Sequence, residues 1–140
     1  MVIEHQTLKA EKVLSHCADV SDDFVPQMLK GIKENISVLK FDICGDIIVA
    51  KRNGGTEFLV PIDREFRSNE NYSFKERVML VNAARLRHYG SFGTICKSLA
   101  ELNDYIEKKS LTPITAPYIV ERDPSDNAYD IYIGISENIV

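Results

Sequence analysis

Three histidines and three cysteines are the residues best suited to nucleophilic or metal chemistry in this 140-residue chain. They are His5, His16, His88, Cys17, Cys44 and Cys96. No two cysteines form a CxxC pair, and no cluster of His, Asp and Glu has metal-ligand spacing, so the sequence predicts no metal site. Each cysteine lies among apolar residues, which indicates a reduced thiol buried in the core. A catalytic pairing of Cys17 with His88 stays open, because two strand ends can bring them together.

The acidic residues point to a second kind of chemistry, which is the recognition of a cation. The net charge is −4, and residues 1–110 are neutral as a group, so the whole excess lies in residues 111–140. That segment holds Glu121, Asp123, Asp126, Asp130 and Glu137 against Arg122 alone. Two interpretations are open: a solvated loop around residues 123–126, or one acid that faces inward and prefers a cationic partner.

Asp130 is the acid whose position favours an inward orientation. Side chains alternate along the expected last strand, so Asp130 and Tyr132 share one face, while the isoleucines between them share the face that packs on helices. A carboxylate walled by Tyr132 and Tyr118, with Tyr89 as a further candidate, attracts an organic cation by its charge and by the ring faces. The alternative is that this face is exposed to solvent, as is usual for antiparallel sheets.

Composition and length exclude several classes of protein. With 44% apolar and 27% charged residues the chain is globular, and its length suits one domain or two halves that share a core. The negative charge argues against direct nucleic-acid binding. The N-terminus lacks the apolar stretch of a signal peptide, and no run approaches the roughly 20 apolar residues of a membrane span, so we expect a cytoplasmic protein. Gly54-Gly55 is typical of a hairpin and Gly90–Gly93 of a helix entry, so no phosphate-binding loop and no cofactor is predicted.

Hydrophobic spacing predicts the same succession of elements twice: a strand, a helix and two strands. In the first half these lie at residues 7–17, 24–39, 41–52 and 56–63, with Ser21 or Asp22 as the helix cap and Asn53-Gly54-Gly55 as the hairpin turn. In the second half they lie at residues 78–90, 91–110, 117–123 and 129–136, with Ser91 as the helix cap, a loop at 111–116 and a turn at 123–128. Polar residues 64–77 read as a linker or loop.

We therefore predict a single domain of two β-α-β-β repeats, at about residues 7–65 and 78–140, with a linker at about 66–77. The predicted fold class is α+β, an antiparallel sheet with both helices on one face and a central groove. Each half alone is too small to bury its helix well, so the halves are expected to share one core.

The second half contains a series of short motifs, and their order along the chain is informative. They are His88-Tyr89-Gly90, Tyr105-Ile106, Pro113 and Pro117, Asp123-Pro124, and the strand Asp130–Ile135. In this order they resemble the GyrI-like effector-binding domains, which also form the ligand-binding half of several multidrug-responsive bacterial transcription activators. The first half fits the same plan more loosely, and its strand Glu57–Ile62 is close to the last-strand motif.

The resemblance implies a tandem fold with a groove that binds small molecules, in which a glutamate on the last strand lies among aromatic side chains. Asp130 stands at that position with a side chain one methylene shorter, and Gly134 replaces the usual proline. The residues expected to bind a ligand are Asp130, Tyr132, Tyr118, Tyr89 and Glu57. The first hypothesis is a stand-alone domain that binds a small hydrophobic or cationic molecule.

Two alternatives stay open beside small-molecule binding. GyrI-like proteins also act on a protein partner, and the acidic C-terminal segment would suit a basic partner surface. Some relatives are hydrolases that activate water with an acid and a tyrosine, and Asp130 with Tyr132 or Tyr89 could do the same if burial raised the pKa of its carboxyl group. Both predicted helices belong to the repeats, so the chain has no helix-turn-helix with which to read DNA.

Overall fold

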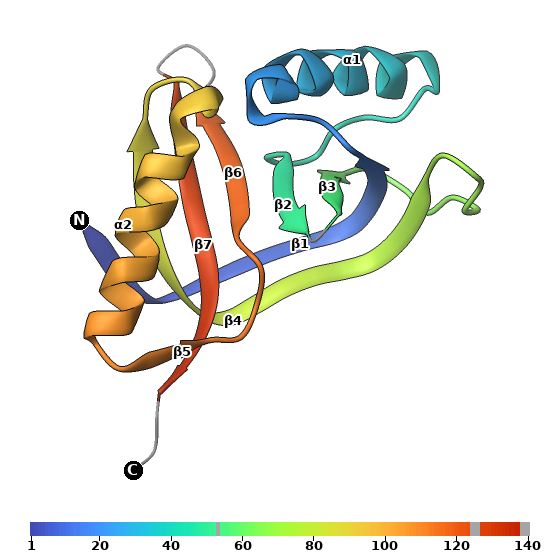
Figure 1. Cartoon of the computed structure of the whole chain (residues 1–140). Coiled ribbons are helices and arrows are strands. Elements are labelled where there is room, and N and C mark those ends of the chain that lie inside the picture. The colour runs from blue at the N-terminus through green and yellow to red at the C-terminus, as the bar shows by residue number, and fades with distance from the viewer. Residues whose placement is uncertain (53, 124–126, 138–140) are drawn as a thin grey trace.

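A computed structural model of the chain describes residues 1–52, 54–123 and 127–137. Its strands are β1 (Val2–Ala18), β2 (Ile48–Arg52), β3 (Gly55–Pro61), β4 (Ser73–Tyr89), β5 (Leu111–Pro113), β6 (Tyr118–Asp123) and β7 (Ala128–Glu137), and its helices are α1 (Val25–Val38) and α2 (Ile95–Lys108) (Figure 1). A single 3-10 turn leads into each helix. None of the described helices combines the length and hydropathy needed to cross a bilayer.

Six of the described strands pair in a closed ring. The order of pairing is β4–β1–β3–β2–β6–β7, and β7 pairs in turn with β4. All of these pairs are antiparallel, and β5 adds to the far end of β7. The long strands β1 and β4 run side by side across the lower part of Figure 1. The sheet therefore has a face turned to the helices and a face turned to the inside of the ring.

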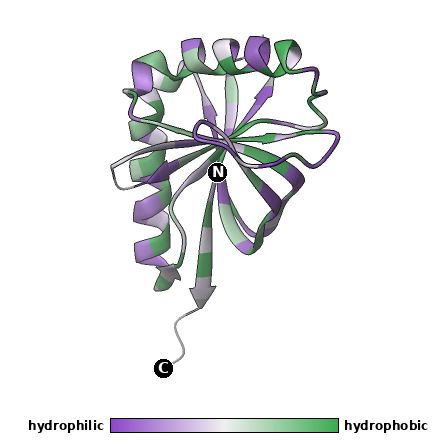
Figure 2. Ribbon diagram, turned by 90° about the vertical axis from the view of Figure 1, so that its right-hand side faces the viewer, coloured by the Kyte–Doolittle hydropathy of each residue, from purple (hydrophilic) through white to green (hydrophobic). Residues whose placement is uncertain are grey.

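The helices cover the outer face of this sheet. Apolar residues of α1 recur every three or four positions, and Val25, Leu29, Ile32 and Ile36 are buried on the stripe that results. The corresponding residues of α2 join them in one core together with the isoleucines of β7. In Figure 2 the two helices lie outside the sheet, α1 across its top and α2 along its left side.

A second, smaller group of buried residues lies on the inner face and contains no helix residue. We call it the inner cluster, and it consists of Leu8, Val13, Ile48, Ala50, Leu59, Leu80, Ala83, Tyr118, Val120 and Tyr132. The alternation predicted for the last strand is confirmed, because Tyr132 belongs to the inner cluster while Ile131 and Ile133 belong to the helix-side core. The predicted α+β class, an antiparallel sheet with two helices, is confirmed as well.

Several expected strand limits are wrong, because pairing partners extend some strands and leave others short. β1 begins at Val2 and β4 at Ser73, since the two strands pair along most of their length and include polar residues expected to be linker. Residues 111–113 form a strand against β7. Residues 41–47 are not a strand and make only the single bridge from Ile43 to Ile62. Asn53 and residues 124–126 of the turn expected at 123–128 lie outside the described residues.

The expectation of buried cysteines is wrong for all three. Cys17 lies at the end of β1, directly opposite Glu57. Cys44 lies in the loop before β2, and Cys96 follows buried Ile95 on the solvent side of α2. Ser21 and Ser91 precede the 3-10 turns and make no capping hydrogen bond, whereas the N-caps of α1 and α2 are Phe24 and Thr94, so the expected helix caps are wrong.

Candidate functional site

Asp130 is fully buried on β7, between β4 and β6. Its partners in the two neighbouring strands are Arg87 and Val120. Arg87 donates from Nε to Oδ1 at 2.8 Å and from Nη2 to Oδ2 at 3.1 Å, and Arg122 donates from Nε to Oδ2 at 2.8 Å. The carboxylate thus receives three N–H groups from two arginines, the charge-assisted arrangement that satisfies a buried acid.

Arg122 connects Asp130 to two further groups. Its Nη1 lies 2.6 Å from an oxygen of Asp46, in the loop before β2, and its Nη2 donates to the Tyr132 hydroxyl at 2.7 Å. The guanidinium carbon lies 6.0 Å from the centre of the Tyr132 ring. We call Asp130, Arg87, Arg122, Asp46 and Tyr132 the Asp130 centre.

A second centre is built around Glu57 on β3. Arg52 donates to Oε1 of Glu57 from Nη2 at 2.8 Å and from Nε at 3.2 Å, while Lys75 and Ser15 donate to Oε2 at 2.6 Å and 2.5 Å. Nη2 of Arg52 also reaches the Tyr118 hydroxyl at 3.1 Å. We call Glu57, Arg52, Lys75, Ser15 and Tyr118 the Glu57 centre.

The two centres share one local plan. Ala50 lies opposite Glu57 and Val120 lies opposite Asp130, and in each case the arginine follows two residues later on the same strand. Side chains two residues apart on a strand point to the same face, so each arginine lies on the face of the acid and contacts it from the neighbouring strand. Each arginine also holds one tyrosine hydroxyl of the inner cluster.

Both acids are held in the charged form. Burial raises the pKa of Asp130, but the hydrogen bonds from Arg87 and Arg122 outweigh it and keep that pKa below its usual value. Burial acts in the same way on Glu57, and the hydrogen bonds from Lys75, Ser15 and Arg52 bring its pKa down to about 2. The expectation of a raised pKa for Asp130 is wrong, because it treated the carboxyl group as unpaired.

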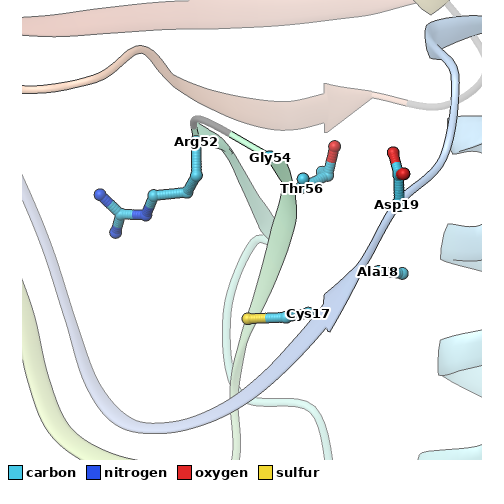
Figure 3. Close-up of a pocket in the computed structure, with 7 residues that line it drawn as sticks. Cys17, Ala18, Asp19, Arg52, Gly54 and Thr56 are labelled. Carbon is cyan, nitrogen blue, oxygen red and sulfur yellow. The ribbon is translucent and has the colours of Figure 1, made fainter.

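A pocket of about 490 Å³ lies next to the Asp130 centre. It is lined by Leu8, Lys9, Ala10, Glu11, Cys44, Gly45, Asp46, Pro61, Val120 and Arg122. Arg122 therefore stands between this pocket and Asp130: its side chain is 33% exposed, against 1% for Asp130. A second pocket of about 310 Å³ lies at the hairpin beside the Glu57 centre and is lined by Cys17, Ala18, Asp19, Arg52, Gly54, Gly55 and Thr56 (Figure 3).

The structure places four of the five expected ligand-binding residues in these two centres and the fifth at the edge of the Asp130 centre, beside Arg87. Asp130, Tyr132, Tyr118 and Glu57 are buried on the inner face, whereas Tyr89, at the end of β4, is 72% exposed. The basic partners Arg87, Arg122, Arg52 and Lys75 were not among the residues expected from the sequence. Strand alternation is the signal that could have found them, because Arg122 and Arg87 fall on the same faces as Val120 and Tyr89.

Among the residues that the structure describes, nothing supports a Cys17–His88 pair or a metal site. Buried His88 contacts Ser98 at 2.7 Å and the carbonyl of Ser91 at 3.0 Å, while Cys17 faces Glu57 on another strand pair. In the part of the chain that the structure describes, no three of the His, Cys, Asp and Glu side chains come together as metal ligands would. His88 therefore ties β4 to the start of α2.

No family model matches the sequence, and no curated protein matches it. Solved structures do match. The crystal structure of the EcmrR C-terminal domain has a TM-score of 0.74 at 10% identity and is covered over 98% of its length by 99% of this chain. In a cryo-EM structure of an EcmrR–DNA complex the TM-score is 0.77 at 12% identity, and the chain spans only 58% of the longer EcmrR chain.

Two further structures resemble the chain more distantly. A hydrolase from Listeria innocua has a TM-score of 0.56 at 11% identity, with 94% of this chain and 90% of that one covered. The protein SAV2435 bound to tetraphenylphosphonium has a TM-score of 0.50 at 10% identity, with coverages of 94% and 93%. The shared property is the fold, and this chain has the fold of the EcmrR C-terminal domain.

Proposed function

We propose that the chain is a cytoplasmic GyrI-like domain that binds a small hydrophobic molecule, cations included, in the pocket beside the Asp130 centre. The observation that carries the proposal is the position of Arg122 between that pocket and a fully buried carboxylate. A fold built only for stability gains little from a buried acid, since apolar residues of similar volume would serve at least as well.

The arrangement suggests how a cation would be accepted. Arg87 by itself contacts both carboxylate oxygens of Asp130. The carboxylate therefore keeps one cationic partner if Arg122 moves. Arg122 in turn keeps its bond to Asp46 at the rim of the pocket. A hydrophobic cation would then replace Arg122 at Asp130, beside the ring of Tyr132, where a cation is also attracted by the ring face. Leu8 and Val120 supply apolar wall for the rest of the ligand.

The likeness to SAV2435 bound to tetraphenylphosphonium supports this choice of ligand class, because that protein carries a hydrophobic cation on the same kind of fold. Hydrolysis is less well supported. A general base needs a pKa near the working pH, whereas the pKa of Asp130 is lowered and Tyr132 is already bound to Arg122. Action on a protein partner stays a prediction of the sequence.

Titration calorimetry with tetraphenylphosphonium tests the proposal. We expect the native protein to bind, and Arg122→Gln to bind about tenfold tighter, because the competing guanidinium is gone while Arg87 still pairs with Asp130. Arg67→Gln, which removes an equal charge from an exposed loop, should leave the affinity unchanged. Circular dichroism shows whether each variant is folded. Absence of binding to the native protein, or weaker binding to a folded Arg122→Gln variant, contradicts the proposal.

A further inference from the structure

The Glu57 centre holds more positive than negative charge. Two cations, Arg52 and Lys75, contact the single carboxylate of Glu57, and Ser15 adds only a neutral hydroxyl. The Asp130 centre differs, because its two arginines face two carboxylates, Asp130 and Asp46. The two centres thus share a plan but not a charge: one is neutral and the other carries an excess of one positive charge.

The excess charge is accessible from solvent. The side chains of Arg52 and Lys75 are 41% and 39% exposed, although the carboxylate between them is buried. Arg52 uses Nε and Nη2 for Glu57 and Tyr118, and no described residue accepts a hydrogen bond from its Nη1. Among the described residues, the ammonium group of Lys75 donates a hydrogen bond to Glu57 alone. Both cations therefore retain N–H groups for an acceptor from outside the chain.

The surroundings favour an acceptor attached to a flat apolar body. The guanidinium carbon of Arg52 lies 5.4 Å from the centre of the Tyr118 ring, which is buried in the inner cluster. Arg52 also lines the pocket of about 310 Å³ at the end of this face, whereas Lys75 and Tyr118 lie outside that pocket's lining. Asp19 lines the same pocket, but the side chain of Arg52 points away from Asp19 in Figure 3.

We infer that the Glu57 centre binds the carboxylate or sulfonate of a small aromatic acid, with Arg52 and Lys75 as the binding groups and Tyr118 beside the aromatic body. The inference rests on the proposed function, since it assigns a ligand class to the second centre of the same inner face. A guanidinium suits such an anion because it offers a planar pair of donors.

Titration calorimetry with 2-naphthalenesulfonate and with 2-naphthylmethylammonium, which share one aromatic body and differ in charge, tests the inference. The sulfonate should bind the native protein, and Lys75→Gln should weaken it about tenfold, the effect of one charge-assisted hydrogen bond. Glu57 keeps Arg52 and Ser15 in that variant, so we expect it to fold. Lys75→Arg, which preserves the charge, should retain binding, and Lys97→Gln on the exposed side of α2 should leave it unchanged.

The possible outcomes separate this inference from the proposed function. If tetraphenylphosphonium binds but the sulfonate does not, the inference is wrong and the proposed function stands. If the sulfonate binds equally well to folded Lys75→Gln, or if Lys97→Gln weakens it as strongly, the anion is not held by the Glu57 centre and the inference fails. Binding about tenfold weaker in Lys75→Gln, with retention in Lys75→Arg, supports it.

Discussion

Gly134, where the resemblance to GyrI-like domains predicts a proline, makes contacts that a proline would not allow. Its N–H donates to the hydroxyl of Thr115 at 2.9 Å, a bond that proline could not make. A Cβ on Gly134 would lie 2.7 Å from the methyl carbon of Thr115. On β3 the arrangement is reversed: the strand carries the larger residue, Pro61, and the loop that packs against it carries the glycine, Gly45. The carbonyl groups of Gly134 and Pro61 each accept a hydrogen bond at 2.8 Å, from the backbone N–H groups of Ile114 and Cys44 respectively.

Gly134→Ala should therefore destabilise the protein by about 1–3 kcal/mol, the usual cost of overpacking a filled site. Urea denaturation followed by circular dichroism measures it. Gly31→Ala is the matched control: nothing lies within 4 Å of its added Cβ, and its position inside α1 should gain about 0.5–1 kcal/mol from helix propensity. The explanation fails if both variants shift stability in the same direction, or if Thr115→Ala does not restore part of the loss in Gly134→Ala.

Each helix contributes to the stability of the fold through a narrow stripe of buried side chains, as α2 shows. Leu102 is fully buried, Leu99 on the preceding turn is only partly buried, and Glu101 faces solvent. Leu102→Ala should cost about 2–5 kcal/mol because it leaves a cavity in the core, whereas Leu99→Ala should cost less. Glu101→Ala should change the free energy of unfolding by no more than about 0.5 kcal/mol. Equal losses for the two leucines in urea denaturation would contradict this account of α2.

The elements differ in how well a single sequence predicts them. The helices follow from the spacing of residues such as Leu29 and Ile32, a local signal, and were placed within a few positions of their observed limits. The start of β4 at Ser73 depends on its distant partner β1, so polar residues there gave no local sign of a strand. Alternation along the last strand predicts that Asp130 faces inward. It does not predict the two positive charges beside the carboxylate, because Arg87 and Arg122 come from other strands.

At the scale of the whole molecule, the two buried acids link stability to pH. The pKa of Glu57 falls from 4.5 to about 2 on folding, and that of Asp130 falls as well. A lowered pKa contributes stability above the unfolded value, and the contribution disappears as the pH falls through the folded value. We expect the free energy of unfolding to decrease between about pH 5 and pH 2, with about 3 kcal/mol from Glu57.

Urea denaturation at a series of pH values measures this decrease. Glu57→Gln should flatten the acid limb, because the group that binds the extra proton on unfolding is absent. Asp63→Asn serves as a control with a smaller effect, because Asp63 is only partly buried and its pKa is lowered mainly by the backbone N–H of Asp42. An acid limb that is equally steep in Glu57→Gln would mean that other carboxyl groups cause it.

The closed ring of strands also determines when the sheet can form. β1 has β4 as a partner over most of its length, and the two strands come from opposite halves of the chain. On the ribosome the first strand therefore emerges long before its main partner has been made, and the part of β1 that precedes its pairing with β3 stays unpaired until then. Contacts between segments so far apart in sequence are made late and slowly. We thus expect nascent chains of this protein to depend on protection from aggregation until β4 has left the exit tunnel.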